Sequence, residues 1–170
     1  RIDMHIVRNQ FAVGRRVQRR AHDTGMALVQ AAHRVEDVRD MRDAMPFYDL
    51  DWYIESRMHK TVKAIFDERG EAGFRKIEHN MLHEVAEFED IIISCGGGTP
   101  CFFDNIDYMN RQGETVYLKA TPEVLYGHLK MGKTIRPLLL NKTADEVQVF
   151  IREQLAQREP YYSKAKYVLD

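Results

Sequence analysis

The amino-acid sequence predicts an α/β protein built on a parallel β-sheet that helices cover on both faces. Strand-like segments alternate with helix-like segments from residue 46 to the end of the chain, which is the order typical of such sheets. Ile91-Ile92-Ile93-Ser94 is a continuous run rich in β-branched residues, the pattern of a strand that is buried on both faces. Gly96-Gly97-Gly98 then ends this run, as a turn after a buried strand would.

Residues 46–88 predict a short strand followed by three helices. Residues 46–51 form a strand-like run that ends in acidic residues, and residues 52–59 have a helical pattern. Thr61 can cap a short helix through residue 66, because its hydroxyl can accept a hydrogen bond from an amide of the first turn. Residues 71–88 predict an amphipathic helix, because apolar residues recur at spacings of three and four. Its buried stripe consists of Phe74, Ile77, Met81, Val85 and Phe88.

The second half of the chain continues the alternation. Thr121-Pro122-Glu123 supplies the cap, the first-turn proline and the early acid of a helix. A later helix carries Val147, Phe150, Ile151 and Leu155 on one face. The expected elements follow in this order: strand 91–94, helix 102–111, strand 115–118, helix 121–131, loop 132–143, helix 144–157 and strand 167–169.

Length and charge limit the class of protein. The chain has 170 residues, 44% of them hydrophobic, which is enough for one core and too short for two ordinary domains. A net charge of −1 argues against nucleic-acid and membrane partners, which select a basic surplus. No apolar run approaches the roughly 18 residues of a membrane span, and two cysteines are too few for a disulfide framework. We expect a monomer in the cytoplasm, with a small molecule or another protein as its partner.

Residues 1–44 differ from the rest in composition. They contain nine arginines and no lysine, and Phe11 is their only aromatic residue. They show no strand-like run, Gly-rich turn or clear cap, and at best residues 24–38 form a polar helix. Three interpretations stay open: a weakly ordered surface segment, translation in a wrong reading frame, or an arginine-rich arm weakened by interleaved acids. We divide the chain into this atypical segment, 1–44, and an α/β domain, 45–170.

Polar residues that follow strands are candidates for a binding site, because ligands of such sheets bind at the carboxyl ends of the strands. Asp49 and Asp51 lie two apart at a strand end, so their side chains should point the same way. Paired carboxylates can hold Mg²⁺ through water and orient a hydroxyl group. The alternative is that Asp51 caps a helix and Asp49 is solvated. The glycines at 96–98 would let backbone amides approach a ligand, or would form a flexible loop.

Three arginines are candidates for binding an anion. Arg75 lies in the first turns of its predicted helix, Arg136 lies in the loop before Pro137, and Arg158 follows the predicted helix 144–157. A guanidinium can bind a carboxylate or a phosphate with two hydrogen bonds, although a single arginine is more often a solvated surface charge.

From residue 46 to the end, about three quarters of the chain, these segments resemble those of the shikimate kinase family in their order and in their amino-acid sequence. The resemblance rests on five segments: residues 48–51 (YDLD), residues 71–78 (EAGFRKIE), residues 93–98 (ISCGGG), residues 136–139 (RPLL) and residues 158–162 (REPYY). It implies a three-layer parallel sheet of the P-loop nucleoside-monophosphate-kinase-like type, with a mobile lid at about 132–143. The implied reaction transfers the γ-phosphoryl group of ATP to the 3-hydroxyl of shikimate, with Mg²⁺ as cofactor.

The resemblance also implies a role for each candidate residue. Asp51 would hold the shikimate hydroxyls and orient the attacking 3-hydroxyl, and Asp49 would help hold Mg²⁺ through water. Arg75 and Arg158, with the backbone of Gly97, would bind the shikimate carboxylate. Arg136, on the lid, would close over the ATP phosphates and stabilise the charge of the transferring group. Such a division suits phosphoryl transfer, which depends mostly on positioning and electrostatics.

The first strand of the family and its phosphate loop, G-x-x-x-x-G-K-[ST], are missing or replaced in residues 1–45. Residues 127–134 match that pattern letter for letter, but they start inside the helix predicted from Thr121 and precede Pro137, so we reject them as the phosphate loop. The family also continues beyond the equivalent of Asp170 with an adenine-side loop and a closing helix. We therefore expect the sheet to lack its central strand. The alternative to an active kinase is an inactive remnant, or a misassigned gene start, that keeps only the shikimate-binding side.

Overall fold

The computed structural model describes residues 11–15, 46–131 and 143–169. Its five strands form one sheet in the order β2-β3-β1-β4-β5. The strands are β1 (Phe11–Arg15), β2 (Phe47–Asp49), β3 (Ile91–Cys95), β4 (Glu114–Leu118) and β5 (Tyr167–Leu169). β2 pairs with β3 and β4 pairs with β5 in parallel, which confirms the α/β class with parallel strands predicted from the sequence.

The central strand corrects two predictions. Residues 1–44 were expected to contain no strand, and β3 and β4 were expected to lack a partner between them. Instead, β1 lies between β3 and β4 and is antiparallel to both. Its sequence, FAVGR, has too little apolar alternation to stand out. The unpaired backbone groups of the two neighbouring strands favour any extended segment that can bond with them, and this requirement is invisible in the local sequence.

The direction of β1 decides where its two ends lie. Phe11 is opposite Cys95 and Arg15 is opposite Ile91. β1 therefore begins at the edge of the sheet where β3 ends, and it finishes at the opposite edge. A loop that followed β1 directly would leave from the edge remote from Gly96-Gly97-Gly98.

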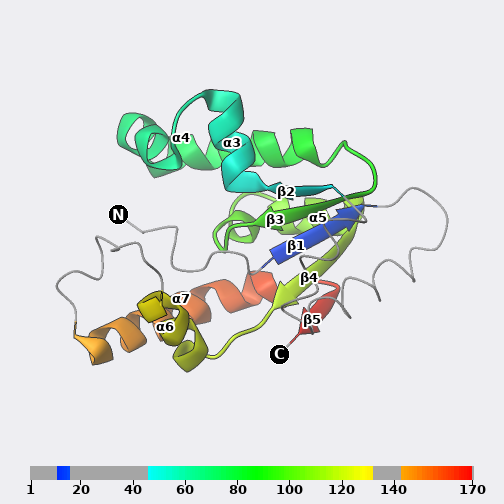
Figure 1. The fold of residues 1–170 in the computed structure, drawn as a ribbon. Helices are drawn as coiled ribbons and strands as arrows, with labels where there is room; N and C mark the ends of the chain where they lie inside the picture. Colours follow the sequence, from blue (N-terminus) through cyan, green and yellow to red (C-terminus); the bar gives the residue numbers. More distant parts are fainter. Residues whose placement is uncertain (1–10, 16–45, 132–142, 170) are drawn as a thin grey trace.

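Helices lie on two sides of the sheet (Figure 1). In this view α3 (Leu50–Met58) and α4 (Val62–Val85) lie above β2, and α6 (Pro122–Met131) and α7 (Ala144–Tyr162) lie at the lower left. The short 3₁₀ helix η2 (Thr99–Cys101) and α5 (Asn105–Gln112) follow β3. η2 contacts α4, α5 and α7, so it lies where three helices meet.

Hydroxyl caps start the helices as the sequence predicted. Thr61 accepts a hydrogen bond from the amide of Ala64, and Thr121 accepts one from Val124. The two helices predicted at 61–66 and 71–88 are one element, α4, with a break at Gly70, where φ is 67°. Such a φ favours glycine, which has no Cβ to clash. α4 ends at Val85, so Phe88 lies beyond the helix that was predicted to contain it.

Two helix predictions had wrong bounds. The helix predicted at 102–111 begins only at Asn105, as α5, because Phe103 has a positive φ of 51°, which a helix does not allow. The helix predicted to end at residue 157 continues to Tyr162. Tyr162 is fully buried, and this tertiary contact stabilises a last helical turn that the sequence pattern does not show.

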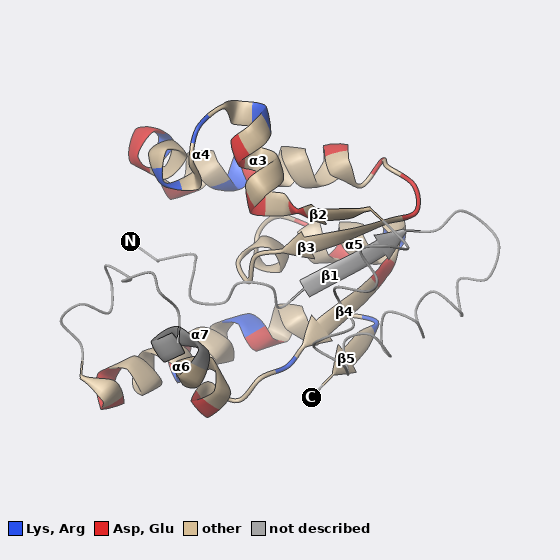
Figure 2. Ribbon diagram, in the orientation of Figure 1, with Lys and Arg blue, Asp and Glu red and all other residues tan. Residues whose placement is uncertain are grey.

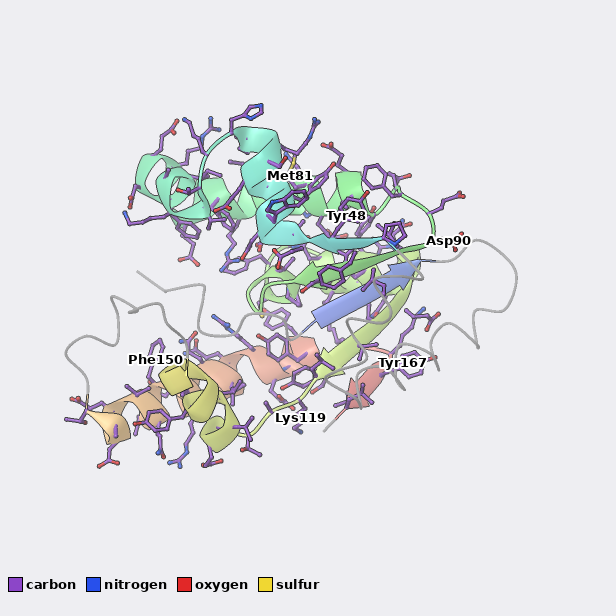
Figure 3. All side chains as sticks on the ribbon, viewed as in Figure 1. Tyr48, Met81, Asp90, Lys119, Phe150 and Tyr167 are labelled. Atoms are coloured by element: carbon purple, nitrogen blue, oxygen red, sulfur yellow. The ribbon has the colours of Figure 1, made fainter. Side chains whose placement is uncertain are left out.

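The main core lies between the sheet and the helices α3, α4 and α5. Phe74 and Val85 of the predicted stripe are fully buried in it, together with Leu82, which the stripe did not include. Ile77 of the stripe is only partly buried. Tyr48 and Met81 are partly buried against this core, where α3 and α4 cover β2 (Figure 3).

Acidic and basic side chains are interspersed on α3, α4 and α7 rather than separated by sign (Figure 2). In the part of the chain that the structure describes, no helix is both long and apolar enough to span a bilayer.

Candidate active site

Arg75 is the most tightly held of the candidate residues. Its side chain is 2% exposed. Its Nη1 donates to Oε2 of Glu78 at 2.8 Å, and its Nη2 lies 3.5 Å from Oε1 of Glu71. Its guanidinium carbon lies 3.9 Å from the centre of the Phe102 ring. Among the described residues, its Nε atom is buried without a hydrogen-bond partner.

Glu78 and Thr99 hold Arg75 in place. Thr99 donates from its hydroxyl to Oε1 of Glu78 at 2.7 Å, while Oε2 of the same carboxylate accepts from Arg75. Glu78 is 1% exposed and Thr99 is 0% exposed, so both oxygens are satisfied within the protein. Glu78 was not among the predicted site residues, although it lies three positions after Arg75, a spacing that places two side chains on one helical face.

The glycines after β3 form a packed turn rather than a flexible loop. The amide of Thr99 donates to the carbonyl of Gly96 at 3.0 Å, and the carbonyl of Gly97 accepts from the hydroxyl of Tyr162. A Cβ on Gly98 would lie 2.5 Å from Nη1 and from Nη2 of Arg75. Glycine is needed at Gly98 because the guanidinium of Arg75 approaches the backbone closely.

Arg158 borders the same turn from α7. It is 8% exposed, and its Nη2 donates to the neutral amide oxygen of Gln154 at 3.1 Å. Burial raises the pKa of the Cys101 thiol to about 11, and the positive charges of Arg158 and Arg75 act in the opposite direction. The same two charges counteract the effect of burial on the pKa of Tyr162. The two arginines therefore lie around one turn, η2, which packs against both of their helices, α4 and α7.

The acidic pair lies at the same edge of the sheet but differs from its predicted geometry. β2 ends at Asp49, and Asp51 lies in the first turn of α3. Asp49 is the N-cap, because its Oδ1 accepts from the amide of Trp52 at 3.1 Å. The prediction that both acids end the strand is therefore wrong, and so is the alternative of Asp51 as the cap. α3 starts two residues early because Asp49 satisfies its first-turn amides.

The carboxylates face the end of β3. Asp49 is opposite Ser94 in the parallel pairing of β2 with β3. Burial raises the pKa of the Cys95 thiol, and three carboxylates raise it further: Glu78, Asp51 and Asp49. The acids and the glycine turn therefore lie near one another at the carboxyl edge of β2 and β3.

Arg136 and most of the predicted lid at 132–143 lie outside the described residues. Thr143, the last residue of that range, caps α7 in a capping box with Glu146. The sequence match at 127–134 begins inside α6 (Pro122–Met131), not after a strand. This position agrees with its rejection as a phosphate loop.

The comparison with known proteins gives the family. The family model described as shikimate kinase matches residues 42–170. This chain belongs to the shikimate kinase family. Shikimate kinases are ATP-dependent kinases that phosphorylate shikimate, and the function predicted from the resemblance is confirmed at the level of the family.

Individual shikimate kinases are similar over the same part of the chain. The enzyme of Bacteroides thetaiotaomicron is 56% identical over 126 residues, which cover 74% of this chain and 72% of the relative. The enzyme of Phocaeicola vulgatus is 58% identical over 125 residues, which cover 74% and 71%.

Solved shikimate kinases share the fold. The crystal structure from Bacteroides thetaiotaomicron has a TM-score of 0.74 and 50% identity, and covers 82% of this chain and 81% of that one. The Acinetobacter baumannii shikimate kinase, solved in complex with shikimate, has a TM-score of 0.69 and 27% identity, and covers 82% and 78%. The nucleoside-monophosphate-kinase-like fold class is thereby confirmed.

Proposed function

We propose that this chain binds shikimate between Arg75, Gly97, Arg158 and Asp51, and forms the substrate-binding half of a shikimate kinase. One observation carries this proposal. Two guanidinium groups, each more than nine-tenths buried, border the same turn after β3. Burying a charge is costly unless an opposite charge meets it. Glu78 meets the charge of Arg75, whereas Arg158 donates to the neutral amide of Gln154, so the charge of Arg158 favours an anionic ligand at this turn.

The hydrogen-bonding capacity of the two arginines supports a carboxylate ligand. Arg158 donates to a neutral amide, and Arg75 keeps a buried Nε that is unpartnered among the described residues. A planar carboxylate can accept from both groups. Tyr162 fixes the Gly97 peptide through its carbonyl, and Asp51, at the same edge of the sheet, is assigned to the shikimate hydroxyls. The Acinetobacter baumannii relative in complex with shikimate supports this choice of carboxylate.

Asp49 suits a Mg²⁺ ion held through water. Its Oδ1 caps α3, and a carboxylate has a second oxygen that can accept from a metal-bound water. When bound, the ion would neutralise negative charge on phosphate oxygens.

The described residues fit ATP less well than they fit shikimate. β1 starts at the edge of the sheet that carries the glycine turn and ends, at Arg15, at the opposite edge. Residues 1–45 contain no G-x-x-x-x-G-K-[ST] sequence. Arg136 alone would leave the β and γ phosphates largely in water, because a phosphate loop supplies several amides and a lysine. We therefore assign shikimate binding to this chain and negligible phosphoryl transfer.

The site belongs to a protein that we assign to the cytoplasm as a monomer acting on small molecules, not on nucleic acid or membranes. The net charge of −1 and the interspersed surface charges support this assignment, because both of those partners select a basic face.

Calorimetric titration with shikimate tests the proposal. Arg158→Lys should weaken binding by about 10- to 100-fold, since a charge-assisted hydrogen bond contributes about 1.5–3 kcal/mol and lysine cannot form the bidentate pair. Arg152→Lys is the matched control, because Arg152 lies on the same helix, α7, but is exposed and pairs with Glu123. An affinity that Arg158→Lys leaves unchanged would contradict the assignment, as would undetectable binding by the unmodified chain.

A further inference from the structure

A second group of polar side chains, which does not include Arg75 or Arg158, lies between α4 and the start of α5. His79 and His83 are four positions apart on α4, with ring centroids 4.3 Å apart. Asp104 precedes α5. One ligand atom from each of the three residues can be chosen so that all lie within 4.8 Å of one another. Imidazole and carboxylate groups at such a spacing are typical ligands of transition metals.

The hydrogen bonds around His79 determine which of its nitrogens is available. Nδ1 of His79 lies 2.6 Å from Oδ1 of Asn105. The Asn105 side chain has a fixed orientation, because its Nδ2 donates to the carbonyl of Thr99 at 2.8 Å. Its Oδ1 therefore accepts, and Nδ1 of His79 must carry the proton. The lone pair of His79 lies on Nε2, as in metal sites where the other ring nitrogen is bonded to an outer partner.

His83 offers a second nitrogen. Its Nε2 is buried and has no hydrogen-bond partner among the described residues. Its ring is stacked on Tyr108, with centroids 3.6 Å apart and planes 15° apart, so its orientation is fixed. Burial lowers the pKa of His83, and the neighbouring His79 lowers it further. The buried Nε2 can bind a metal ion without giving up a hydrogen bond within the described residues.

Asp104 completes the group. Its Oδ2 pairs with Nη2 of Arg111 at 3.2 Å, and both side chains are more than half exposed. Surface ion pairs of this kind contribute little, so Asp104 can turn toward the histidines at small cost, and its other oxygen is a further acceptor. Two more charges act on His83: Glu87, which is negative, and Arg111, which is positive.

We propose that His79, His83 and Asp104 bind a divalent transition-metal ion of the zinc class. The ion would have three protein ligands and water in the fourth position, as the open geometry of such sites allows. Ligands in a tetrahedral zinc site lie about 3.3 Å apart, given bonds of about 2.0–2.1 Å. The three ligand atoms lie within 4.8 Å of one another, so a small inward shift completes the site, and the exposed Asp104 is free to make such a shift. The bound ion would join α4 to the start of α5. It is separate from the Mg²⁺ position assigned to Asp49.

Equilibrium dialysis of the untagged chain against Zn²⁺, with Co²⁺ absorption spectra to report the geometry, tests the site. The unmodified chain should bind one ion with a tetrahedral Co²⁺ spectrum. His79→Gln, His83→Gln and Asp104→Asn should each weaken this binding by about 100-fold or more, because changes to outer partners alone cost about 10- to 100-fold. His59→Gln is the control, because His59 is exposed at the end of α3, outside the group.

The melting temperature gives a second measurement of metal binding at this group. Zn²⁺ should raise the melting temperature of the unmodified chain and of His59→Gln, but not that of Asp104→Asn, which replaces an exposed side chain and should fold. Binding that survives in the His79→Gln/His83→Gln double variant would locate the ion on other histidines and overturn the proposal. Failure of the unmodified chain to bind Zn²⁺ or Co²⁺ would overturn it as well.

Discussion

At the scale of single residues, the position of Arg75 depends on atoms from three segments. Glu78 of α4 accepts from it, Thr99 of η2 holds Glu78, and Gly98 leaves room for the guanidinium. The guanidinium is thus oriented before any ligand binds. Preorganised groups of this kind lower the entropy cost of binding.

Gly98→Ala should weaken shikimate binding by about 10- to 100-fold, the effect of losing a charge-assisted hydrogen bond. The added Cβ would lie 2.5 Å from both terminal nitrogens of Arg75, so the guanidinium must move. Gly96→Ala is the control, because the nearest atom to its Cβ would be the Thr99 hydroxyl at 3.8 Å. Titration calorimetry of both variants measures the difference. Equal affinities would mean that the position of Arg75 does not matter for binding.

Cys101 should react slowly with iodoacetamide. Burial raises the pKa of its thiol to about 11, so at pH 8 only about a thousandth is thiolate, the reactive form. The labelling rate, followed by mass spectrometry, should rise about tenfold per pH unit until near pH 11. Arg158→Gln should slow it further, because the charge of Arg158 lowers the pKa of Cys101. Rapid labelling of the folded chain at pH 8 would contradict this environment.

The same pKa shift affects stability. The folded state holds the Cys101 proton more tightly than the unfolded state, whose thiol has a pKa of about 8.5. The resulting contribution is complete below about pH 8.5 and is lost as the pH rises toward 11.

At the scale of secondary-structure elements, the sequence predicted those whose signals are local. β3 was recognised from its β-branched run, and the starts of α4 and α6 from threonine caps. Elements that depend on distant contacts were missed. The last turn of α7 is stabilised by a hydrogen bond from Tyr162 to Gly97, which spans 65 positions, and no local pattern encodes such a contact.

The residues of the candidate site also differ in whether the sequence alone could identify them. Arg75, Gly97 and Arg158 came from the resemblance, and the structure brings them to one turn. Glu78, Thr99 and Tyr162, which fix that turn, were not found, because partners of a buried charge are chosen by packing in three dimensions. The geometry expected for Asp49 was wrong because a helix cap ended the strand early.

Tyr162→Phe should destabilise the chain by about 1–3 kcal/mol, because it leaves the buried carbonyl of Gly97 with only the weak thiol donor of Cys101. Urea unfolding measures the change. Tyr161→Phe is the matched control: Tyr161 is the preceding residue on α7 and is 37% exposed. If both substitutions had the same effect, the hydroxyl of Tyr162 would not stabilise the turn.

At the scale of the whole molecule, residues 42–170 match the shikimate kinase family. The central strand β1, which precedes them, is antiparallel to both neighbours, whereas the sequence predicted a parallel sheet. The family match begins at residue 42, close to where the lysine-free, arginine-rich segment stops. β1 fills the central position in the opposite direction. The interpretation of residues 1–44 as a wrong reading frame stays a hypothesis, and reading the coding DNA upstream of Met45 in all frames tests it.

The central claim is that this chain binds shikimate without a working ATP site. Titration calorimetry of one preparation, first with shikimate and then with Mg-ATP, tests it most directly, with Lys133→Ala as the control for the sequence match at 127–134. We predict saturable binding of shikimate, no micromolar binding of Mg-ATP and little effect of Lys133→Ala. Micromolar binding of Mg-ATP that Lys133→Ala abolishes would contradict the account.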